Sequence, residues 1–315
     1  MKALNVPAAG EQPVVSDLPV PEVTEGTVLV RVKAAGLNPA DNHLVARMMA
    51  AWLPHEYPLT LGRDAAGVVE AVGAGVGHVR PGDEVIGHML LAPPVKAGTL
   101  AEYAVLPAAA VFPKPAGLSF TAAAALPLSA GTAAAAVDAA GPEPGQTVLV
   151  VGAGGGVGSF AVQLLAARGA RVVATGRPAD VDRLTGLGAA AVIDYTAGPV
   201  AGQVLAACPD GVDALIDLVA YAADALPLSA VRKGGKVVST LHAADDQALA
   251  AAGLTGANVN GRPVRELLAP LAEQAAAGTL KIGISDVLPL ERAADGLAAI
   301  ATGNAHGKIV VTIGP

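Results

Sequence analysis

The sequence has a single cysteine, Cys208, among its 315 residues. One thiol excludes an internal disulfide and a metal cluster built from several cysteines, so we expect Cys208 to serve only in packing. Basic residues are also few, because 20 Lys and Arg stand against 27 Asp and Glu, with a formal net charge of −7. No basic stripe or local Lys/Arg cluster is present, and nucleic acid is therefore not expected as a partner.

Aromatic residues make up only 3% of the chain, although 53% of its residues are hydrophobic, many of them alanine. Two uncharged stretches, residues 115–137 and 144–167, reach the length of a membrane span. Pro127 and Gly131 interrupt the first and a glycine-rich turn interrupts the second, so each would leave backbone groups unpaired in lipid. The N-terminus lacks the long apolar segment of a signal peptide. The sequence predicts a cytoplasmic globular protein that does not contact membranes.

A glycine-rich run, Gly-Ala-Gly-Gly-Gly-Val-Gly, occupies residues 152–158, after an apolar strand at 147–151 and before a helix expected to begin at Ser159. Such a turn lets the backbone approach a phosphate, and N–H groups at the helix start bind a dinucleotide pyrophosphate. A second strand, at 170–174, follows about 20 residues later, as this fingerprint requires. A flexible glycine loop is the alternative. The predicted cofactor contacts in the run are Gly152, Gly155, Gly156, Val157 and Gly158.

The sequence changes character near residue 118. Before this point, short apolar segments at 26–34, 67–72, 83–86 and 101–105 are separated by Pro and Gly and predict a β-rich domain. After it, five apolar strands at 147–151, 171–174, 191–193, 214–218 and 236–240 alternate with helical or glycine-rich segments, which predicts a doubly wound parallel sheet. The tail, 280–313, is again strand-like. We therefore predict an α/β fold, with residues 1–118 and 262–315 in one domain and 119–261 in a dinucleotide-binding domain.

Several motifs follow one another in the order known from one family. Asn-Pro-Ala-Asp at 38–41 is similar to its Asn-Pro-x-Asp segment, and Gly-Arg-Asp-Ala-Ala-Gly-Val-Val at 62–69 to its Gly-Arg-Asp strand. Residues 81–85, 98–103, 154–158 and 307–311 continue the series. The chain thus resembles the zinc-independent, quinone oxidoreductase-like branch of the medium-chain dehydrogenase/reductases (MDR). The resemblance implies a GroES-like catalytic domain, a Rossmann domain inserted before its final strands, and a homodimer.

Metal ligands are scarce. A catalytic zinc needs three protein ligands drawn from Cys, His and acidic residues. The segments that carry these ligands in metal-dependent relatives contain Asn38, Arg63 and Asp64 here, and the four-cysteine structural lobe is missing. No two of the six histidines have the close helical spacing of a metal-binding pair. The sequence therefore predicts no metal.

The end of the second Rossmann strand indicates the cofactor. NAD enzymes usually carry an acidic residue there, whereas NADP enzymes lack it and supply cations. The strand here ends Thr175-Gly176-Arg177, and no acid occurs before Asp180. Arg177 can bind a phosphate through two N–H groups, or it is merely a surface cation. The resemblance implies that Thr175 and Tyr195 also contact the cofactor. Arg183 either replaces the lysine that is usual in the family or, as we favour, is a solvated helix residue. We predict NADPH.

Hydride transfer without zinc favours acceptors that are already electron-poor, such as quinones and conjugated carbonyls. The enolate or hydroquinone anion that results can be protonated from water, so a catalytic acid is optional. We therefore predict a reductase of such small molecules. Enoyl (C=C) reduction in a biosynthetic pathway is an alternative. A non-catalytic NADPH-binding sensor or scaffold is an alternative of another class.

The resemblance places Asn38 near the nicotinamide and the substrate oxygen, Thr132 at the nicotinamide ribose, and Leu218, Thr240 and Lys308 among the cofactor contacts. His43 occupies a position where relatives often have an active-site tyrosine, and an imidazole could donate to a substrate oxygen. The candidate catalytic residues are therefore Asn38 and His43. A surface histidine is the alternative for His43, and water remains the favoured proton source. Residues 47–57, including Trp52, are expected to line the substrate pocket or to pack in the core.

Overall fold

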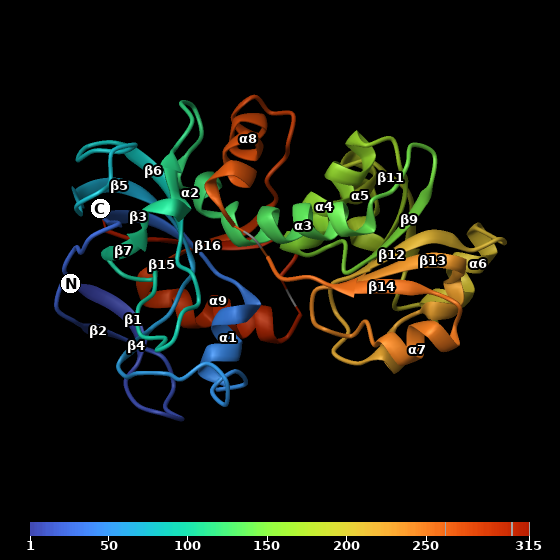
Figure 1. Cartoon of the computed structure of the whole chain (residues 1–315), viewed down its shortest axis with the longest axis horizontal. Helices are drawn as coiled ribbons and strands as arrows, with labels where there is room; N and C mark the ends of the chain where they lie inside the picture. Colours follow the sequence, from blue (N-terminus) through green and yellow to red (C-terminus); the bar gives the residue numbers. More distant parts are fainter. Residues whose placement is uncertain (262, 304, 315) are drawn as a thin grey trace. The chain divides into compact units, whose positions relative to one another are not determined.

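The computed structural model describes residues 1–261, 263–303 and 305–314 and divides into two compact units (Figure 1). Unit 1 comprises Met1–Leu128 and Pro263–Pro315, and unit 2 comprises Ser129–Arg262. The first boundary follows residue 128 and not the expected residue 118, because helix α2 (Phe120–Ala124) packs against strands β3 and β5 of unit 1. Residue 262, where the second boundary was expected, lies outside the described residues.

The main sheet of unit 1 is built around β3 (Thr27–Gly36), whose alternate residues Val28, Val30 and Val32 are buried, as a strand with one face on a core requires. The sheet has the order β15-β16-β3-β5-β6-β8, and β7 also pairs with β3. Its other members are β5 (Asp64–Val72), β6 (Glu84–His88), β7 (Tyr103–Pro107), β8 (Val111–Pro113), β15 (Ile284–Pro289) and β16 (Lys308–Thr312). A smaller sheet contains β2 (Val14–Asp17), β1 (Lys2–Val6) and β4 (Leu59–Thr60).

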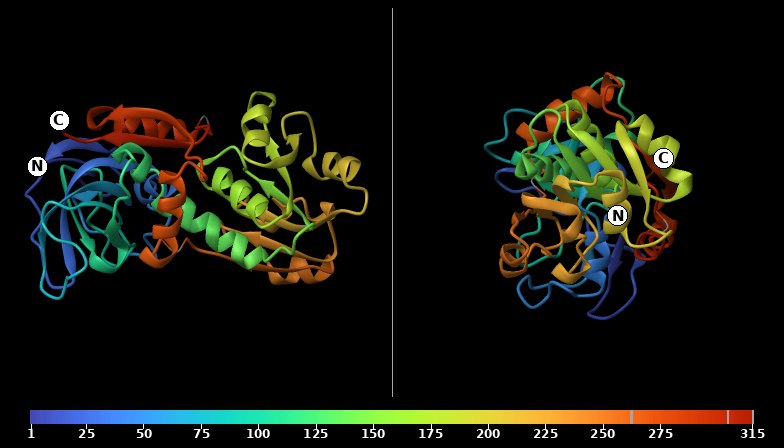
Figure 2. Two further views of the ribbon diagram at one scale, coloured as in Figure 1. Left: turned by 90° about the horizontal axis from the view of Figure 1, so that it is seen from above. Right: turned by 90° about the vertical axis from the view of Figure 1, so that its right-hand side faces the viewer.

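The C-terminal segment returns to this sheet, because β16 pairs antiparallel with β3. In the left view of Figure 2, the red C-terminal strands accordingly lie beside the blue N-terminal part of unit 1. The expectation of a strand-like tail was incomplete, since helix α9 (Ala293–Ala301) lies between β15 and β16. Alanine, which fills much of this segment, is the residue with the highest helix propensity. Helix α8 (Arg265–Ala276) precedes β15, and the short helix α1 (Pro39–Val45) follows β3.

Unit 2 contains a six-stranded parallel sheet of order β11-β10-β9-β12-β13-β14, with helices on both faces (Figure 1). The predicted doubly wound fold is confirmed, and its five predicted strands are β9 (Thr147–Val151), β10 (Arg171–Gly176), β11 (Ala189–Asp194), β12 (Val212–Asp217) and β13 (Val231–Ser239). Strand β14 (Thr255–Asn258) was missed, because its residues Thr-Gly-Ala-Asn have little strand propensity as a group. The helices are α3 (Pro127–Ala140), α4 (Gly156–Ala167), α5 (Val181–Gly186), α6 (Val200–Ala207) and α7 (Asp246–Ala251).

The strand order of this sheet reverses between β9 and β12, which are neighbours although the chain forms two strands between them. In open α/β sheets, ligands bind at such a point, beyond the carboxyl ends of the strands. Val151 and Asp217, the last residues of β9 and β12, are paired there. The glycine-rich turn follows Val151, so the fold brings it to the position expected for a cofactor site.

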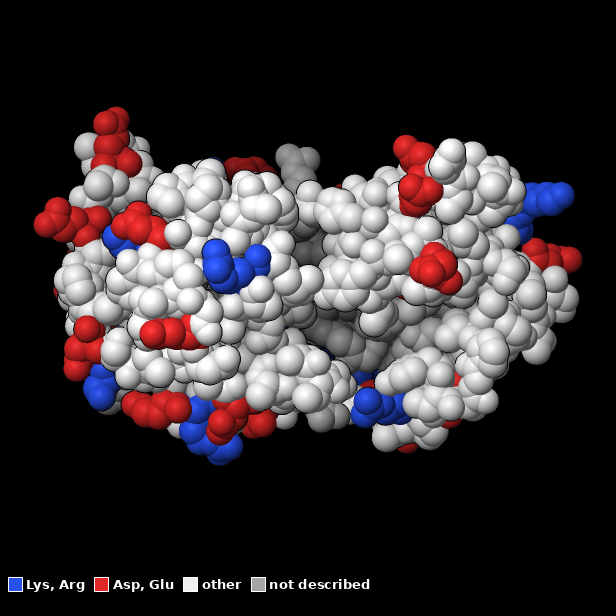
Figure 3. All heavy atoms as spheres, turned by 90° about the horizontal axis from the view of Figure 1, so that it is seen from below, with Lys and Arg blue, Asp and Glu red and all other residues white. Residues whose placement is uncertain are grey.

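Charged side chains are scattered over the face drawn in Figure 3, where Lys and Arg form small separate groups and no continuous stripe. Within the described ranges, no helix is both long and apolar enough to cross a membrane. Cys208 is a buried free thiol, and Nη1 of Arg171 lies 3.0 Å from its sulfur.

Candidate functional site

The glycine-rich turn of unit 2 is shorter than expected. Helix α4 begins at Gly156 and not at Ser159, because Gly155 is its N-cap. Gly156, Val157 and Gly158 therefore form the first helical turn, whose N–H groups have no acceptor within the helix. Gly152 has φ +84°, a backbone conformation that favours glycine. The turn thus presents unpaired donors at the helix start, as a dinucleotide pyrophosphate requires.

The glycines of the turn meet different surroundings. A Cβ atom added to Gly155 would touch only the carbonyl oxygen of Gly152, at an ordinary 3.5 Å. A Cβ atom on Gly158 would lie 2.3 Å from the same oxygen and 2.5 Å from Cα of Ala153. Gly158 is therefore needed for the helix to pack on the turn, whereas a side chain at Gly155 would meet no close protein contact.

Two of the predicted cofactor residues meet at the ends of β10 and β11. Nε of Arg177 donates a hydrogen bond to the hydroxyl of Tyr195 at 2.7 Å, and Tyr195 is 45% exposed. The nearest acid along the chain, Asp180, is buried and accepts hydrogen bonds from the Arg177 backbone N–H at 3.1 Å and from Nη2 of Arg183 at 2.7 Å. The Asp180 carboxylate is thus bonded to the protein itself. The accessible side chains at this corner, where β10 and β11 end, are the Arg177 guanidinium and the Tyr195 phenol.

Arg183 is not the solvated helix residue that we favoured. Its Nη2 donates to the carbonyl oxygen of Gly154 at 3.1 Å as well as to Asp180, and so connects α5 to the glycine turn. The spacing of three residues between Asp180 and Arg183 brings the two side chains together on one side of the helix. Thr175 also supports the turn, because its buried hydroxyl oxygen accepts a hydrogen bond from the Gly152 N–H at 3.0 Å.

Leu218 and Thr240 lie at the same edge of the sheet as the turn. The Leu218 N–H donates to the carbonyl oxygen of Val151, and the Thr240 N–H to that of Asp217, both at 3.2 Å. The structure therefore groups these two predicted contacts with the turn. Thr132 is buried on α3.

The other predicted residues belong to unit 1, where four strand ends meet. Asp64 begins β5 and is paired with Gly36 at the end of β3 and with His88 at the end of β6. Lys308 begins β16, the other neighbour of β3. Asn38, two residues beyond β3, is the N-cap of α1. The topology thus gathers four polar residues, Asn38, Asp64, His88 and Lys308, at one edge of the sheet, and they form the cluster around Asp64.

Asn38 and Lys308 are both buried in this cluster. Nδ2 of Asn38 donates to Oδ2 of Asp64 at 2.9 Å and to the Gly36 carbonyl at 3.2 Å, and its Oδ1 accepts from Nζ of Lys308 at 2.6 Å. Lys308 also donates to the Leu37 carbonyl at 2.8 Å. Each polar atom of the Asn38 amide therefore has a protein partner, and the contacts of Asn38 and Lys308 described here are with the protein itself.

Ionisation of the cluster follows from burial and from neighbouring charges. Burial alone would raise the pKa of Asp64, but the Lys308 ammonium, the His88 side chain and the Asn38 amide together hold this pKa below its ordinary value. Asp41 is different, since burial raises its pKa although Arg63 and the N–H groups of Asn38 and Gly62 act in the opposite direction. The cluster therefore contains an ionised Asp64 in a fixed position.

His43 lies on α1 and is half-buried, and this burial lowers the pKa of its imidazole. Met48 and Trp52, in the segment after α1, are 57% and 69% exposed, so the core-packing alternative is wrong for these two side chains. For Met48 and Trp52, a place in the wall of the substrate pocket stays a prediction.

Sequence reasoning missed His88 as part of the site. Its Nδ1 lies 2.8 Å from Oδ1 of Asp64, and its side chain is only 6% exposed. The available signal was a histidine that directly follows the apolar run Val85-Ile86-Gly87, a position at the end of a buried strand. The sequence singled out only His43 as a possible proton donor, and it gave His88 no role beyond a possible metal ligand.

The residues of the cluster do not fit a zinc ion. The Asp64 carboxylate accepts from His88 and the Leu128 N–H on Oδ1, and from Asn38 and Lys308 on Oδ2. Its oxygens are thus occupied by N–H donors, and the Lys308 ammonium already supplies a positive charge. The described ranges contain no group of three His, Cys, Asp or Glu residues that could hold a metal ion.

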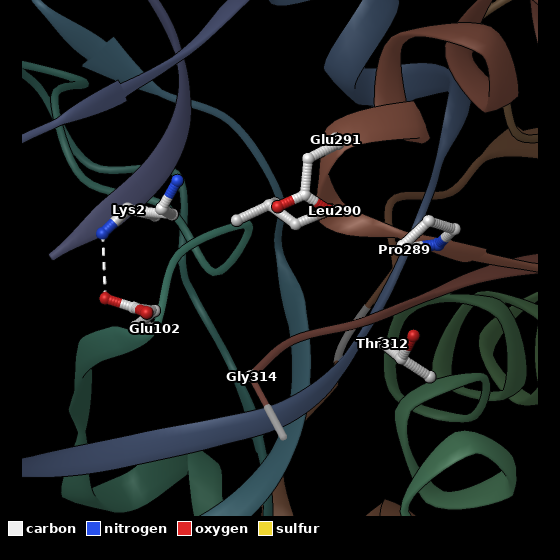
Figure 4. Close-up of a pocket in the computed structure, with 7 residues that line it drawn as sticks. All are labelled: Lys2, Glu102, Pro289, Leu290, Glu291, Thr312 and Gly314. Carbon is white, nitrogen blue, oxygen red and sulfur yellow. Dashed lines mark hydrogen bonds between the residues drawn. The ribbon is translucent and has the colours of Figure 1, made fainter.

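A surface cavity of about 200 Å³ lies elsewhere in unit 1 (Figure 4). It is lined by Lys2, Glu102, Pro289, Leu290, Glu291, Thr312 and Gly314. Thr312 ends β16, which Lys308 begins, and four residues of strand span about 13 Å. The cavity is therefore separate from the cluster around Asp64.

Two family models match the chain. Residues 24–116 match the alcohol dehydrogenase GroES-like domain, and residues 187–311 match the model described as zinc-binding dehydrogenase. The 2-methylene-furan-3-one reductase of Solanum lycopersicum is 33% identical over 94% of this chain and 74% of that protein. The chloroplastic NADPH-dependent alkenal/one oxidoreductase of Arabidopsis thaliana is 31% identical over the same shares.

The chain belongs to the medium-chain dehydrogenase/reductase family. Among solved MDR structures, one titled NAD-dependent alcohol dehydrogenase has 32% identity and a TM-score of 0.88, with both chains covered completely. The quinone oxidoreductase of Coxiella burnetii has 28% identity and a TM-score of 0.87, covering 99% of this chain and 98% of that one. The predicted family and fold are thereby confirmed, and the protein is an MDR-type oxidoreductase that uses a nicotinamide dinucleotide.

Proposed function

We propose that this MDR protein is an NADPH-dependent, zinc-independent oxidoreductase that transfers hydride to a quinone or another conjugated carbonyl compound. The observation that carries the proposal is the donor set at Asp64, whose two oxygens accept from four N–H groups. A site of this composition offers no Lewis acid to polarise an ordinary carbonyl. An acceptor that is already electron-poor removes that need.

The names of the relatives support this class of substrate. A 2-methylene-furan-3-one and an alkenal or alkenone each contain a carbonyl conjugated to C=C, and a quinone is a conjugated dicarbonyl. Enoyl (C=C) reduction in a biosynthetic pathway remains the second candidate, since two of these relatives are named for such activated alkenes. The non-catalytic sensor is disfavoured, because these relatives are named as enzymes.

NADPH is proposed over NADH because of the corner formed by Arg177 and Tyr195. The guanidinium carries a positive charge and the hydroxyl a further donor, both of which suit the 2′-phosphate. An NAD site would instead need a free carboxylate for the ribose hydroxyls, and Asp180 is bonded to the Arg177 N–H and to Arg183.

When bound, the reduced nicotinamide supplies the hydride. The chain would bind the pyrophosphate through the first-turn N–H groups of α4, and the 2′-phosphate through Arg177 and Tyr195. Asn38 and Lys308 would act indirectly, because their amide and ammonium fix the position of the Asp64 carboxylate. The location of the protein in the cytoplasm and its assembly into a homodimer stay predictions.

The test is NADPH oxidation by the purified protein with a panel of p-quinones, enones and enals. Each enone is matched with its saturated ketone, which has the same carbon skeleton and lacks the conjugated C=C bond. We expect turnover with conjugated acceptors only, and faster turnover with NADPH than with NADH. Reduction of the saturated ketones at a comparable rate, or tight NADPH binding without turnover of any acceptor, would contradict the proposal.

A further inference from the structure

We propose that His88, oriented by Asp64, donates the proton that the substrate oxygen takes up after hydride transfer. This inference rests on the proposed function, because it assigns a residue to the second half of the same reaction. It concerns an imidazole and a carboxylate that come from neighbouring strands, β6 and β5, and are paired in register.

The geometry of the pair is that of a carboxylate that positions an imidazole. Nδ1 of His88 lies 2.8 Å from Oδ1 of Asp64, and the two side chains are 6% and 0% exposed. A carboxylate at Nδ1 fixes the ring and leaves Nε2 as the nitrogen that exchanges a proton with a reactant. Asp64 cannot turn away, because Leu128, Asn38 and Lys308 donate to its two oxygens.

Nε2 of His88 is the ring nitrogen that Asp64 does not engage. In the described part of the chain, it has no hydrogen-bond partner, and it is not among the fully buried side-chain nitrogens without a partner, which belong to His55, Arg63 and Arg183. The small accessible area of the His88 side chain, 6%, therefore includes Nε2. Leu90 and Leu91 are 44% and 38% exposed, so the chain carries apolar surface directly after the strand that ends at His88. An apolar quinone or enone would suit such a surface.

The position also agrees with the expected substrate site. Asn38, which the family resemblance places near the nicotinamide and the substrate oxygen, donates to Oδ2 of Asp64, while His88 bonds Oδ1 of the same carboxylate. The imidazole is therefore two hydrogen bonds away from the Asn38 amide. His43 fits the role less well, because burial lowers the pKa of its imidazole and so depletes the charged form that donates a proton.

The proposed step balances as follows. Hydride addition to the β-carbon of an enone moves the C=C electron pair toward the carbonyl and leaves an enolate oxygen. The N–H bond at Nε2 of the His88 imidazolium breaks, its proton bonds the enolate oxygen, and neutral imidazole remains. Asp64 stays ionised throughout and stabilises the imidazolium before transfer. Solvent then returns a proton to Nε2, and the enol becomes the saturated ketone.

The test compares the wild-type protein with His88→Gln and His88→Ala in enone reduction. Glutamine keeps a polar group near Asp64 but transfers no proton, so we expect kcat to fall about 100-fold while NADPH affinity stays unchanged. Added imidazole should restore part of the kcat of His88→Ala. His78→Gln is the matched control, because His78 is an exposed histidine of unit 1 that bonds the Val111 carbonyl, and it should leave kcat unchanged.

The pH profile separates proton transfer from a merely structural role. Lys308, Arg63 and Asp41 are the other charged groups around Asp64, so a limb of the kcat profile is assigned to His88 only if the His88 variants lose it. Full kcat and an unchanged profile in folded His88→Gln would overturn the proposal. If neither variant folds, a wild-type kcat that does not vary between about pH 5 and about pH 9 would overturn it. Wild-type protein without turnover of any acceptor would instead contradict the proposed function.

Discussion

The ammonium of Lys308 lies 2.6 Å from Oδ1 of Asn38 and 3.5 Å from Oδ2 of Asp64, and all three side chains are buried. Burial lowers the pKa of Lys308, although the negative charges of Asp64 and Asp41 act in the opposite direction. Removing one member of such a pair leaves the other charge uncompensated in the interior. The stability of unit 1 therefore depends on the presence of both.

We expect Lys308→Met to lower the free energy of unfolding by about 3–5 kcal/mol, the usual cost of breaking a buried ion pair from one side. Methionine keeps most of the side-chain volume, so that the loss reports on charge and hydrogen bonds. Lys281→Met is the matched control, because Lys281 is exposed. Denaturant unfolding measures the difference, and equal stability of the two variants would contradict a structural role for the Lys308 ammonium.

The same substitution should change acid unfolding. Because the pKa of Asp64 in the folded protein is below its ordinary 3.8, its ionisation stabilises the fold above that value, and this contribution is lost as the pH falls through the folded pKa. Lys308 is the largest influence that lowers this pKa. Without it the folded pKa rises, so Lys308→Met should begin to unfold at higher pH than the wild-type protein. Unfolding followed by circular dichroism against pH tests this, and coincident acid midpoints would argue against it.

Gly155→Val should abolish NADPH binding while the protein stays folded. Its φ of −80° is open to any L-residue, and its Cβ position is free of close contacts, so the branched side chain would project into the space proposed for the pyrophosphate. Gly158→Ala is the contrasting variant. Its Cβ would lie 2.3 Å from the Gly152 carbonyl oxygen, so we expect loss of thermal stability as well as of binding. NADPH fluorescence titration and thermal unfolding separate the two effects, and unchanged affinity in folded Gly155→Val would place the phosphates elsewhere.

The turn could be predicted from the sequence because its signals are local. Strand β9, Gly152 with its positive φ and the glycine start of α4 all lie between Thr147 and Gly156. Only the first residue of α4 was misplaced, since a glycine N-cap leaves no Ser, Thr, Asp or Asn to mark the helix start.

The cluster around Asp64 could not be predicted in the same way. Asp64 meets His88 across 24 positions of sequence and Lys308 across 244. Such contacts follow from strand register, and a shift by one residue would turn each of these side chains to the other face of the sheet. The family resemblance supplied Asn38 and Lys308 as expected cofactor contacts, yet only the register of β3, β5, β6 and β16 shows that they hold a carboxylate.

Removal of metal ions should leave activity unchanged. We expect dialysis against a chelator to have no effect on NADPH oxidation with an enone, because the lone pairs of Asp64 accept N–H donors and Arg63 is a buried cation that donates to the Thr60 and Ala97 carbonyls. Metal analysis of the purified protein is the second measurement. Stoichiometric zinc, or activity that a chelator removes and zinc restores, would contradict the zinc-independent proposal.

Cofactor preference should depend on Arg177. We expect Arg177→Glu to weaken NADPH binding at least about tenfold, because hydrogen bonds to charged groups contribute about 1.5–3 kcal/mol and the new carboxylate repels the 2′-phosphate. NADH lacks this phosphate and should be affected much less.

Tyr195→Phe removes the hydroxyl that Arg177 contacts at 2.7 Å and should produce a smaller loss of the same selectivity. Lys233→Glu makes the same charge change at an exposed site of unit 2 and should leave the ratio of the two dissociation constants unchanged. An equal loss of NADPH and NADH affinity in Arg177→Glu would mean that Arg177 supports the fold of the site and does not contact the phosphate.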